Sequence, residues 1–248
     1  MSRYWLNSKP TDEAALAIFN AQAERICDTY AATPALRAQG VHTISTDEMT
    51  GIQALERIAP TLPTGPGLIE RLEFEYIRHG TQSLIANFDV ATGQIIAPSI
   101  GDTRNEQDFA QHIERTVDTD PIATWIFVTD QLNTHQSEAL VQLVAKRCDI
   151  TFDLGLKGKS GILKSIATRA EFLQDPSHCL RFVYTPKHSS WLNQIEIWFS
   201  ILVRRLLKRA SFSSLADLRQ RILDFITYFN QTMAKPFKWT FTGRPLVA

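Results

Sequence analysis

The sequence predicts an α/β fold in which a mixed β-sheet carries helices on its faces. Three observations support it: β-rich segments of alternating polarity come first, continuous apolar strands alternate with helical segments later, and no repeat or low-complexity tract interrupts them. With 248 residues, 44% of them hydrophobic, the chain can bury a sizeable core. We therefore expect a linker and helix over residues 1–40 and one main domain over residues 41–248.

The first segments predict one helix followed by a strand. Residues 11–13 form a typical helix start, and residues 14–31 place apolar side chains at helical spacing. Pro34 removes a backbone donor, so we expect the helix to close there. Residues 41–47 then alternate in polarity and predict a strand that ends at Asp47.

Three antiparallel strands are expected next, after a loop rich in proline and glycine over residues 60–67. The turns between them are predicted at His79-Gly80 and over residues 89–93, where Asp and Gly favour tight turns. The strands themselves are expected over residues 73–78, 82–89 and 94–97.

Helices and buried strands alternate in the second half. Residues 125–128 are continuously apolar, which is typical of a strand buried on both faces, and residues 181–184 predict another short strand. A stretch rich in lysine and glycine opens an insertion near residues 155–180. Helices are expected over residues 105–117, 137–147 and 215–229. Two more are expected, one that follows the glycine-rich stretch and ends near residue 173, and one that begins after Pro186.

Composition excludes several classes of protein. No apolar run approaches the roughly 18 to 20 residues of a membrane span, and the N-terminus has no signal-peptide pattern, so we expect a cytoplasmic protein without a membrane partner. The three cysteines, Cys27, Cys148 and Cys179, are widely spaced and lack a CxxC pair. We therefore expect ordinary thiols rather than a disulfide framework or a zinc site.

The net charge of zero conceals two opposed halves. Residues 1–150 hold 11 basic and 20 acidic residues, a net charge of −9, whereas residues 151–248 hold 15 basic and 6 acidic residues, a net charge of +9. Such asymmetry is expected where acidic metal ligands and a surface for a polyanion share one protein. Two solvated faces that meet at a domain contact would give the same numbers.

Three acids occupy informative positions. Asp47 and Asp130 follow predicted strands, and Glu196 borders an apolar helical stripe with no basic residue three or four positions away. Three carboxylates from distant segments can hold a pair of hard divalent cations, which together stabilise the attacking and leaving oxygens of a phosphodiester displacement. Each acid alone has an ordinary alternative: a helix cap, a turn residue, or a partner of a remote arginine.

Three blocks of sequence resemble the signature blocks of DDE transposases, in particular the bacterial insertion-sequence 630 family of the mariner superfamily. They cover residues 45–53, 128–135 and 188–199, and the likeness extends from about residue 40 to the C-terminus. The resemblance implies an RNase H-like DDE catalytic domain with Asp47, Asp130 and Glu196 as catalytic metal ligands. It further implies two Mg²⁺ or Mn²⁺ ions, DNA ends and target DNA as partners, a homodimer, and association with the bacterial nucleoid.

Further residues are expected to support this site. Four polar residues near the acids could orient a ligand, a water or a phosphate, or could instead be ordinary caps and loop groups: Asn133, His135, His188 and Asn193. Six basic residues could grip the DNA backbone, or could simply be solvated: Lys157, Lys159, Lys187, Arg204, Arg205 and Lys208. Asp89, in a turn, and Glu48, on the opposite strand face from Asp47, are not expected to be ligands.

The sequence also departs from the family pattern. Relatives carry helix-turn-helix modules ahead of the catalytic domain, whereas only about forty residues precede the first strand here, so a separate helix-turn-helix polypeptide is one expected partner. Tyr4-Trp5-Leu6-Asn7 resembles the linker that follows such a module. The interval of 66 positions from Asp130 to Glu196 is long. Two alternatives stay open: an RNase H-like nuclease without strand transfer, and a non-catalytic remnant that binds DNA or a full-length transposase.

Overall fold

A single twisted sheet forms the centre of the computed structural model, which describes residues 12–60, 62–71 and 73–243. Within these residues the sheet has five strands in the order β3-β2-β1-β4-β5. The first three strands pair in antiparallel fashion, and β4 and β5 join as parallel strands. The strands are β1 (Val41–Arg57), β2 (Tyr76–Asp89), β3 (Ile95–Gly101), β4 (Thr124–Thr129) and β5 (Leu180–Tyr184).

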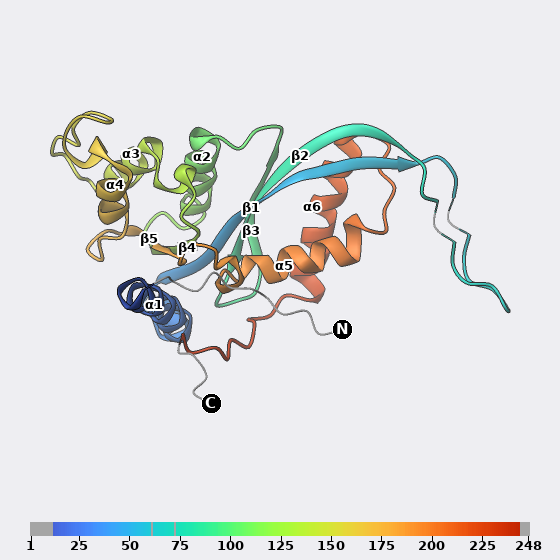
Figure 1. The fold of residues 1–248 in the computed structure, drawn as a ribbon, viewed down its shortest axis with the longest axis horizontal. Coiled ribbons are helices and arrows are strands. Elements are labelled where there is room, and N and C mark those ends of the chain that lie inside the picture. The colour runs from blue at the N-terminus through green and yellow to red at the C-terminus, as the bar shows by residue number, and fades with distance from the viewer. Residues whose placement is uncertain (1–11, 61, 72, 244–248) are drawn as a thin grey trace.

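Helices cover both faces of this sheet (Figure 1). One face packs against the first helix and the last two, the other face against the three middle helices, and each face has its own apolar core. The predicted mixed α/β fold is therefore confirmed. The helices are α1 (Glu13–Ala38), α2 (Glu106–Val117), α3 (Glu138–Arg147), α4 (Ile166–Leu173), α5 (Ile195–Leu202) and α6 (Leu215–Thr232).

The first strand is longer than predicted. β1 does not stop at Asp47 but continues to Arg57, so Asp47 lies inside the strand. The parallel register pairs Ser45 with Val128, and β4 ends one residue later at Thr129. Beyond that point β1 pairs with β2 alone. The prediction fails because it places the end of β1 at Asp47, whereas the strand that ends at this level is the neighbouring β4.

The expected turn at His79-Gly80 is also wrong. β2 runs through both residues as one strand, and the β1–β2 hairpin extends well beyond the rest of the sheet (Figure 1). Gly80 has a φ of +125°, and a Cβ there would come within 3.2 Å of Leu215 on α6. Glycine therefore marks a close approach to a helix rather than a turn. The second turn, over residues 89–93, is confirmed, with Gly93 at a φ of +76°.

Helix α1 continues through Pro34 to Ala38, past the predicted end. Proline costs one backbone hydrogen bond, but packing on the sheet outweighs this cost because Ile26 and Tyr30 are buried in the core. The helix is closed instead by Gln39 and by Gly40, whose φ is +76°. Tyr4-Trp5-Leu6-Asn7 lies outside the described residues.

The predicted insertion is a compact excursion between α3 and β5. After a glycine-rich loop it contains a short 3₁₀ turn and α4, and the side chain of Arg169 on α4 is buried. The Nε of Arg169 donates to the carbonyl of Gln136 at 2.6 Å, so the insertion is fastened to the segment that follows β4. Among the described helices, none is both long enough and apolar enough to cross a membrane.

Candidate active site

Asp47 and Asp130 meet where β4 ends. Since Ser45 pairs with Val128 in parallel register, Asp47 lies level with Asp130, two positions further along each chain. Asp47 is buried, at 8% exposure, whereas the Asp130 side chain is 38% exposed. The strand register alone therefore brings two of the three predicted acids together.

Glu196 enters the site from α5. The helix does not begin directly after Pro186 as expected: a 3₁₀ turn over Ser190–Leu192 comes first, and α5 starts at Ile195. Glu196 is therefore the second residue of the helix, where the positive end of the helix dipole favours a carboxylate. It is partly buried, and its electrostatic coupling to both Asp47 and Asp130 places it at the same site.

Asn193 fastens the start of α5 to β1. Its side-chain amide donates to the Thr46 carbonyl at 2.9 Å and to the Asp47 carboxylate at 3.2 Å, and its oxygen accepts from the Ser45 hydroxyl. The same hydroxyl accepts from the backbone of Ile195 at 2.8 Å. The position of Glu196 relative to Asp47 is thus fixed by a fully buried set of hydrogen bonds.

Helix α1 also contacts the loop that precedes Glu196. The hydroxyl of Tyr30 donates to the carbonyl of Leu192 at 3.0 Å and accepts from the backbone of Gln194 at 3.4 Å. Tyr30 is buried and packs edge-on against Trp239, at 5.1 Å between ring centroids. Helix α1 therefore contributes directly to the position of the loop that precedes Glu196.

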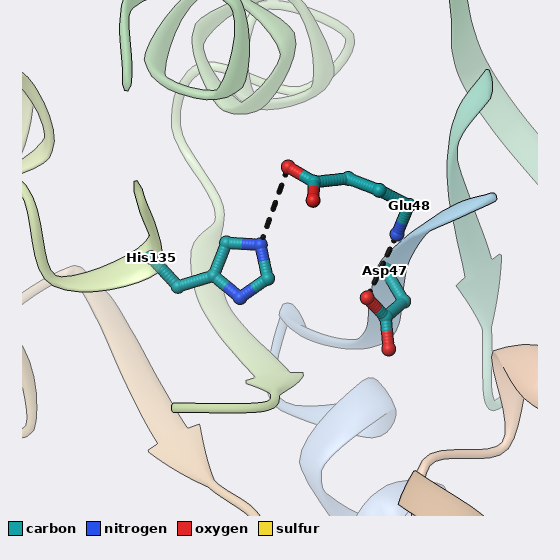
Figure 2. Close-up of side chains that lie close together, drawn as sticks. All are labelled: Asp47, Glu48 and His135. Atoms are coloured by element: carbon teal, nitrogen blue, oxygen red, sulfur yellow. Dashed lines mark hydrogen bonds and ion pairs between the residues drawn. The ribbon is translucent and has the colours of Figure 1, made fainter. Parts of the chain in front are cut away.

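His135 holds Asp130 on the other side of the site. Its Nδ1 lies 2.7 Å from an Asp130 carboxylate oxygen and 2.9 Å from the Thr129 hydroxyl, and the imidazole is fully buried. Its Nε2 faces Glu48 at 3.5 Å (Figure 2). The imidazole thus lies between two carboxylates and contacts Asp130 directly, while its predicted supporting role in the reaction stays a prediction.

Glu48 is the residue that sequence reasoning missed. Its side chain is 2% exposed and also meets Arg104 at 3.5 Å. Strand parity correctly placed it on the opposite face from Asp47, but His135 approaches on that same face, which nothing in the sequence revealed. Among the described residues, one ligand atom each of Asp47, Glu48 and His135 lies within 4.8 Å of the others. Figure 2 shows Glu48 directed towards His135, while Asp47 accepts from the Glu48 backbone at 2.8 Å.

The carboxylates repel one another. Burial, and after it the charge of Asp130, raise the pKa of Asp47 to about 7, and the same two causes raise the pKa of Glu196. Burial would also raise the pKa of Asp130, but the hydrogen bond and charge of His135 lower it below its usual range. Burial disfavours charge on His135 as well, yet Asp130 and Glu48 raise its pKa to about 9. The two carboxylates thus favour the protonated imidazole of His135 against the effect of burial.

The other predicted supporting residues are less closely involved. Asn133 and His188 are exposed, and His188 has a φ of +60°, which is uncommon outside glycine. Lys157 is paired with Glu106 at 3.3 Å and with Glu138 at 3.5 Å, so its charge is already partly neutralised. The remaining predicted DNA-binding residues are exposed: Lys159, Lys187, Arg204, Arg205 and Lys208.

A basic hollow follows α5. The helix passes into a π-helix over Val203–Leu207, and Arg209 lies in the turn that follows it. Arg204 and Arg209, five positions apart, line one hollow of about 580 Å³ together with Arg205 and the apolar Ile201 and Met233. Within the described part of the chain none of these arginines forms an ion pair, and Arg209 was not predicted.

The fold and the acids agree with one family of proteins. A family model described as a DDE superfamily endonuclease matches residues 42–219, well over half of the chain. The chain belongs to this family. The match contains the positions of all three predicted acids of the DDE endonuclease, Asp47, Asp130 and Glu196. None of the curated proteins matches the sequence.

Solved structures give the DDE endonuclease the same RNase H-like fold as Mos1 mariner transposase. The Mos1 paired end complex with Mn has a TM-score of 0.56 at 14% identity, and covers 92% of this chain and 58% of that chain. The catalytic domain of Mos1 mariner transposase has a TM-score of 0.51 at 12% identity, with 90% and 85% covered. The chain thus spans 58% of the length of the Mos1 chains in these paired end complexes.

The charge pair between Glu48 and His135 can be tested without any cofactor. Glu48→Gln removes a buried negative charge 3.5 Å from the imidazole, so we expect the pKa of His135 in the metal-free protein to fall by roughly 1. An NMR titration of the His135 ring would measure this. Glu114→Gln, which removes a carboxylate on α2 that pairs with Lys146, should leave the titration unchanged. An unaltered His135 titration in Glu48→Gln would contradict the assigned contact.

Proposed function

We propose that this DDE endonuclease is the catalytic part of a transposase, which cuts DNA at the ends of a mobile element and joins the freed 3′-hydroxyl to target DNA. Asp47, Asp130 and Glu196 are the proposed catalytic residues. The observation that carries the proposal is their convergence: β1, β4 and α5 bring three carboxylates from distant parts of the chain close enough that, after burial, the charge of Asp130 raises the pKa of both Asp47 and Glu196.

The residues present fit two divalent cations such as Mg²⁺ or Mn²⁺. Carboxylate oxygens are the ligands these ions prefer, and the raised pKa of Asp47 reflects burial and repulsion that a cation would relieve. We propose Asp47, Asp130 and Glu196 as the ligands. The chemistry that such ions supply when bound is activation of the attacking hydroxyl and stabilisation of charge on the leaving oxygen.

The protein's own groups provide a rigid frame for this chemistry. Asn193 holds Asp47 from the α5 face, while His135 holds Asp130 from the α2 face and keeps it ionised. Because both acids are fixed before DNA arrives, little reorganisation is needed during the reaction. In the first step water breaks a phosphodiester bond and leaves a 3′-hydroxyl, and in the second that hydroxyl displaces a 3′ oxygen of the target strand. One site can perform both steps.

The test uses DNA carrying pre-cut element ends, a target plasmid and Mn²⁺. Joined product supports the transposase. Nicking without joining would support the alternative of a nuclease, and the absence of metal-dependent nicking would support a non-catalytic remnant. The assay needs the DNA that flanks the gene, because the terminal repeats must be taken from there.

The basic hollow supports DNA as the substrate. Its three arginines form no ion pair with any described residue, and Arg204 follows Glu196 by eight positions, which is roughly 12 Å along a helix. A strand whose scissile phosphate lies at Glu196 would therefore meet these guanidinium groups within two or three nucleotides. Guanidinium groups bind phosphate oxygens in pairs of hydrogen bonds. We propose the hollow as a grip on the DNA backbone.

Removing the grip should weaken DNA binding and its dependence on salt. For Arg204→Ala/Arg209→Ala we expect the affinity for any DNA sequence to fall about tenfold, and the slope of log K against log salt to decrease by roughly 2, because two phosphate contacts are lost. Fluorescence anisotropy at several salt concentrations measures both. The control is Lys146→Ala/Arg219→Ala, which removes two positive charges on other helices. An equal loss of DNA affinity in both variants would show that the net charge, and not the hollow, determines binding.

Two protein partners are proposed as well. The outer end of the β1–β2 hairpin exposes Leu68, Ile69 and Phe74 at 59%, 79% and 82%, more apolar surface than a solvated loop needs. A second copy of the chain is the partner we propose for it, to be tested by light scattering with Ile69→Asp and Phe74→Asp.

A helix-turn-helix polypeptide remains the proposed reader of the element ends. The DNA substrate would place the protein at the bacterial nucleoid in the cytoplasm.

A further inference from the structure

Two of the three thiols lie side by side at the base of the insertion. Cys148 caps the end of α3 and Cys179 immediately precedes β5. Their Sγ atoms are 3.0 Å apart although 31 positions separate them in the sequence. The third thiol, Cys27, is buried in the other core, where it accepts from the indole of Trp239. The sequence spacing gave no indication of this pairing.

We propose that Cys148 and Cys179 are a site of reversible oxidation and form an intramolecular disulfide. A disulfide needs an Sγ separation of about 2.05 Å, so the two sulfurs, 3.0 Å apart, need to approach by about 1 Å. Both residues are only partly buried, and Cys148 lines a surface hollow of about 750 Å³, so an oxidant can reach it. Thiols of proteins in reducing compartments oxidise in this way as a response rather than as a permanent feature.

The oxidant we assign is a small disulfide such as glutathione disulfide. Cys148 lines the hollow through which the oxidant arrives, so Cys148 attacks first. Its sulfur loses a proton, bonds to one glutathione sulfur and releases the other glutathione as a thiol. Cys179 then loses its proton and attacks the Cys148 sulfur, which forms the protein disulfide and releases the second glutathione. Two electrons pass from the cysteines to the oxidant.

The bond would close the insertion at its base. It would join the two ends of the segment that carries Arg169, and Arg169 holds the carbonyl of Gln136 directly after His135. Closing a loop of this length raises stability by restricting the unfolded chain. For a protein of this size, we expect the melting temperature to rise by roughly 5 to 10 °C, and we expect the insertion to resist proteolysis longer.

The test treats the folded full chain with glutathione disulfide, unfolds it, and labels the remaining thiols with N-ethylmaleimide. We expect one label, on Cys27, and a pair of tryptic peptides joined by a bond between Cys148 and Cys179. The melting temperature should rise on oxidation and fall back to its original value when the bond is reduced. Cys148→Ser should retain labels on Cys27 and Cys179 and show no oxidant-dependent rise, whereas Cys27→Ser should still form the bond. Three labels, stable glutathione adducts on both cysteines, or a dimer linked through Cys148 would each overturn the proposal.

Discussion

Glu196→Gln should reduce metal-dependent DNA cleavage by on the order of 10³-fold or more while leaving DNA affinity within about twofold. The change keeps the size of the side chain but removes the negative charge that a divalent cation needs. Glu196 is partly buried at the start of α5, and its surroundings already disfavour its charge, so the amide should be accommodated without loss of folding. Nicking of a supercoiled plasmid with Mn²⁺ and anisotropy with labelled DNA measure the two properties separately.

A matched variant makes this result specific. Glu171→Gln removes an exposed carboxylate from α4, in the insertion, and should leave both cleavage and binding unchanged. Parallel loss of cleavage and binding in Glu196→Gln, or an altered circular dichroism spectrum, would show instead that Glu196 has a structural role. Unchanged cleavage would remove Glu196 from the proposed catalytic residues.

Asp47→Asn should stabilise the metal-free protein at pH 8 and have little effect near pH 4. In the folded state burial, and after it the charge of Asp130, raise the pKa of Asp47 from its ordinary 3.8 to about 7. The folded protein therefore binds a proton more tightly than the unfolded chain, and its stability falls as pH rises from about 4 through 7. At about 1.4 kcal/mol per pKa unit, the variant should gain roughly 2 to 4 kcal/mol at pH 8.

Thermal unfolding of parent and variant across this pH range measures the difference, expected to reach roughly 5 to 10 °C at pH 8. Adding Mg²⁺ or Mn²⁺ should then stabilise the parent but not the variant, because only the parent retains the ligand. Glu171→Gln should differ from the parent by a constant amount at every pH. A variant that is less stable than the parent at pH 8 would mean that the Asn193 and backbone contacts of Asp47 outweigh its desolvation.

Much of the site was predictable because its signals are local. A continuous apolar run identified the strand before Asp130, and the Asp-to-Glu order of three blocks indicated the family. Asn193 was expected beside Glu196 and lies against Asp47, although its role in the reaction stays a prediction. These features depend on residues that are neighbours in sequence or that share one element.

What could not be predicted depends on contacts between distant segments. The end of β4, rather than any signal in β1, places Asp47 level with Asp130 at the edge of the parallel pairing. Glu48 was set aside on strand parity, and only the approach of His135 to that face gives it a partner. Arg209, in the turn after the π-helix, lines the same hollow as Arg204, and no hydrophobic periodicity indicates this. Helix α1 continues through Pro34 because its packing on the sheet outweighs the lost hydrogen bond, and a rule based on local sequence does not include such packing.

The long helix α1 bears on where the catalytic unit begins. The family match starts at residue 42, yet Ile26 and Tyr30 are part of the core beneath α5, and Tyr30 touches the loop before Glu196. A fragment that begins at residue 41 would keep every signature residue but lose the α1 side chains that complete this core. Helix α1 is therefore part of the catalytic unit, and a fragment without it should misplace Glu196 although it carries all three acids.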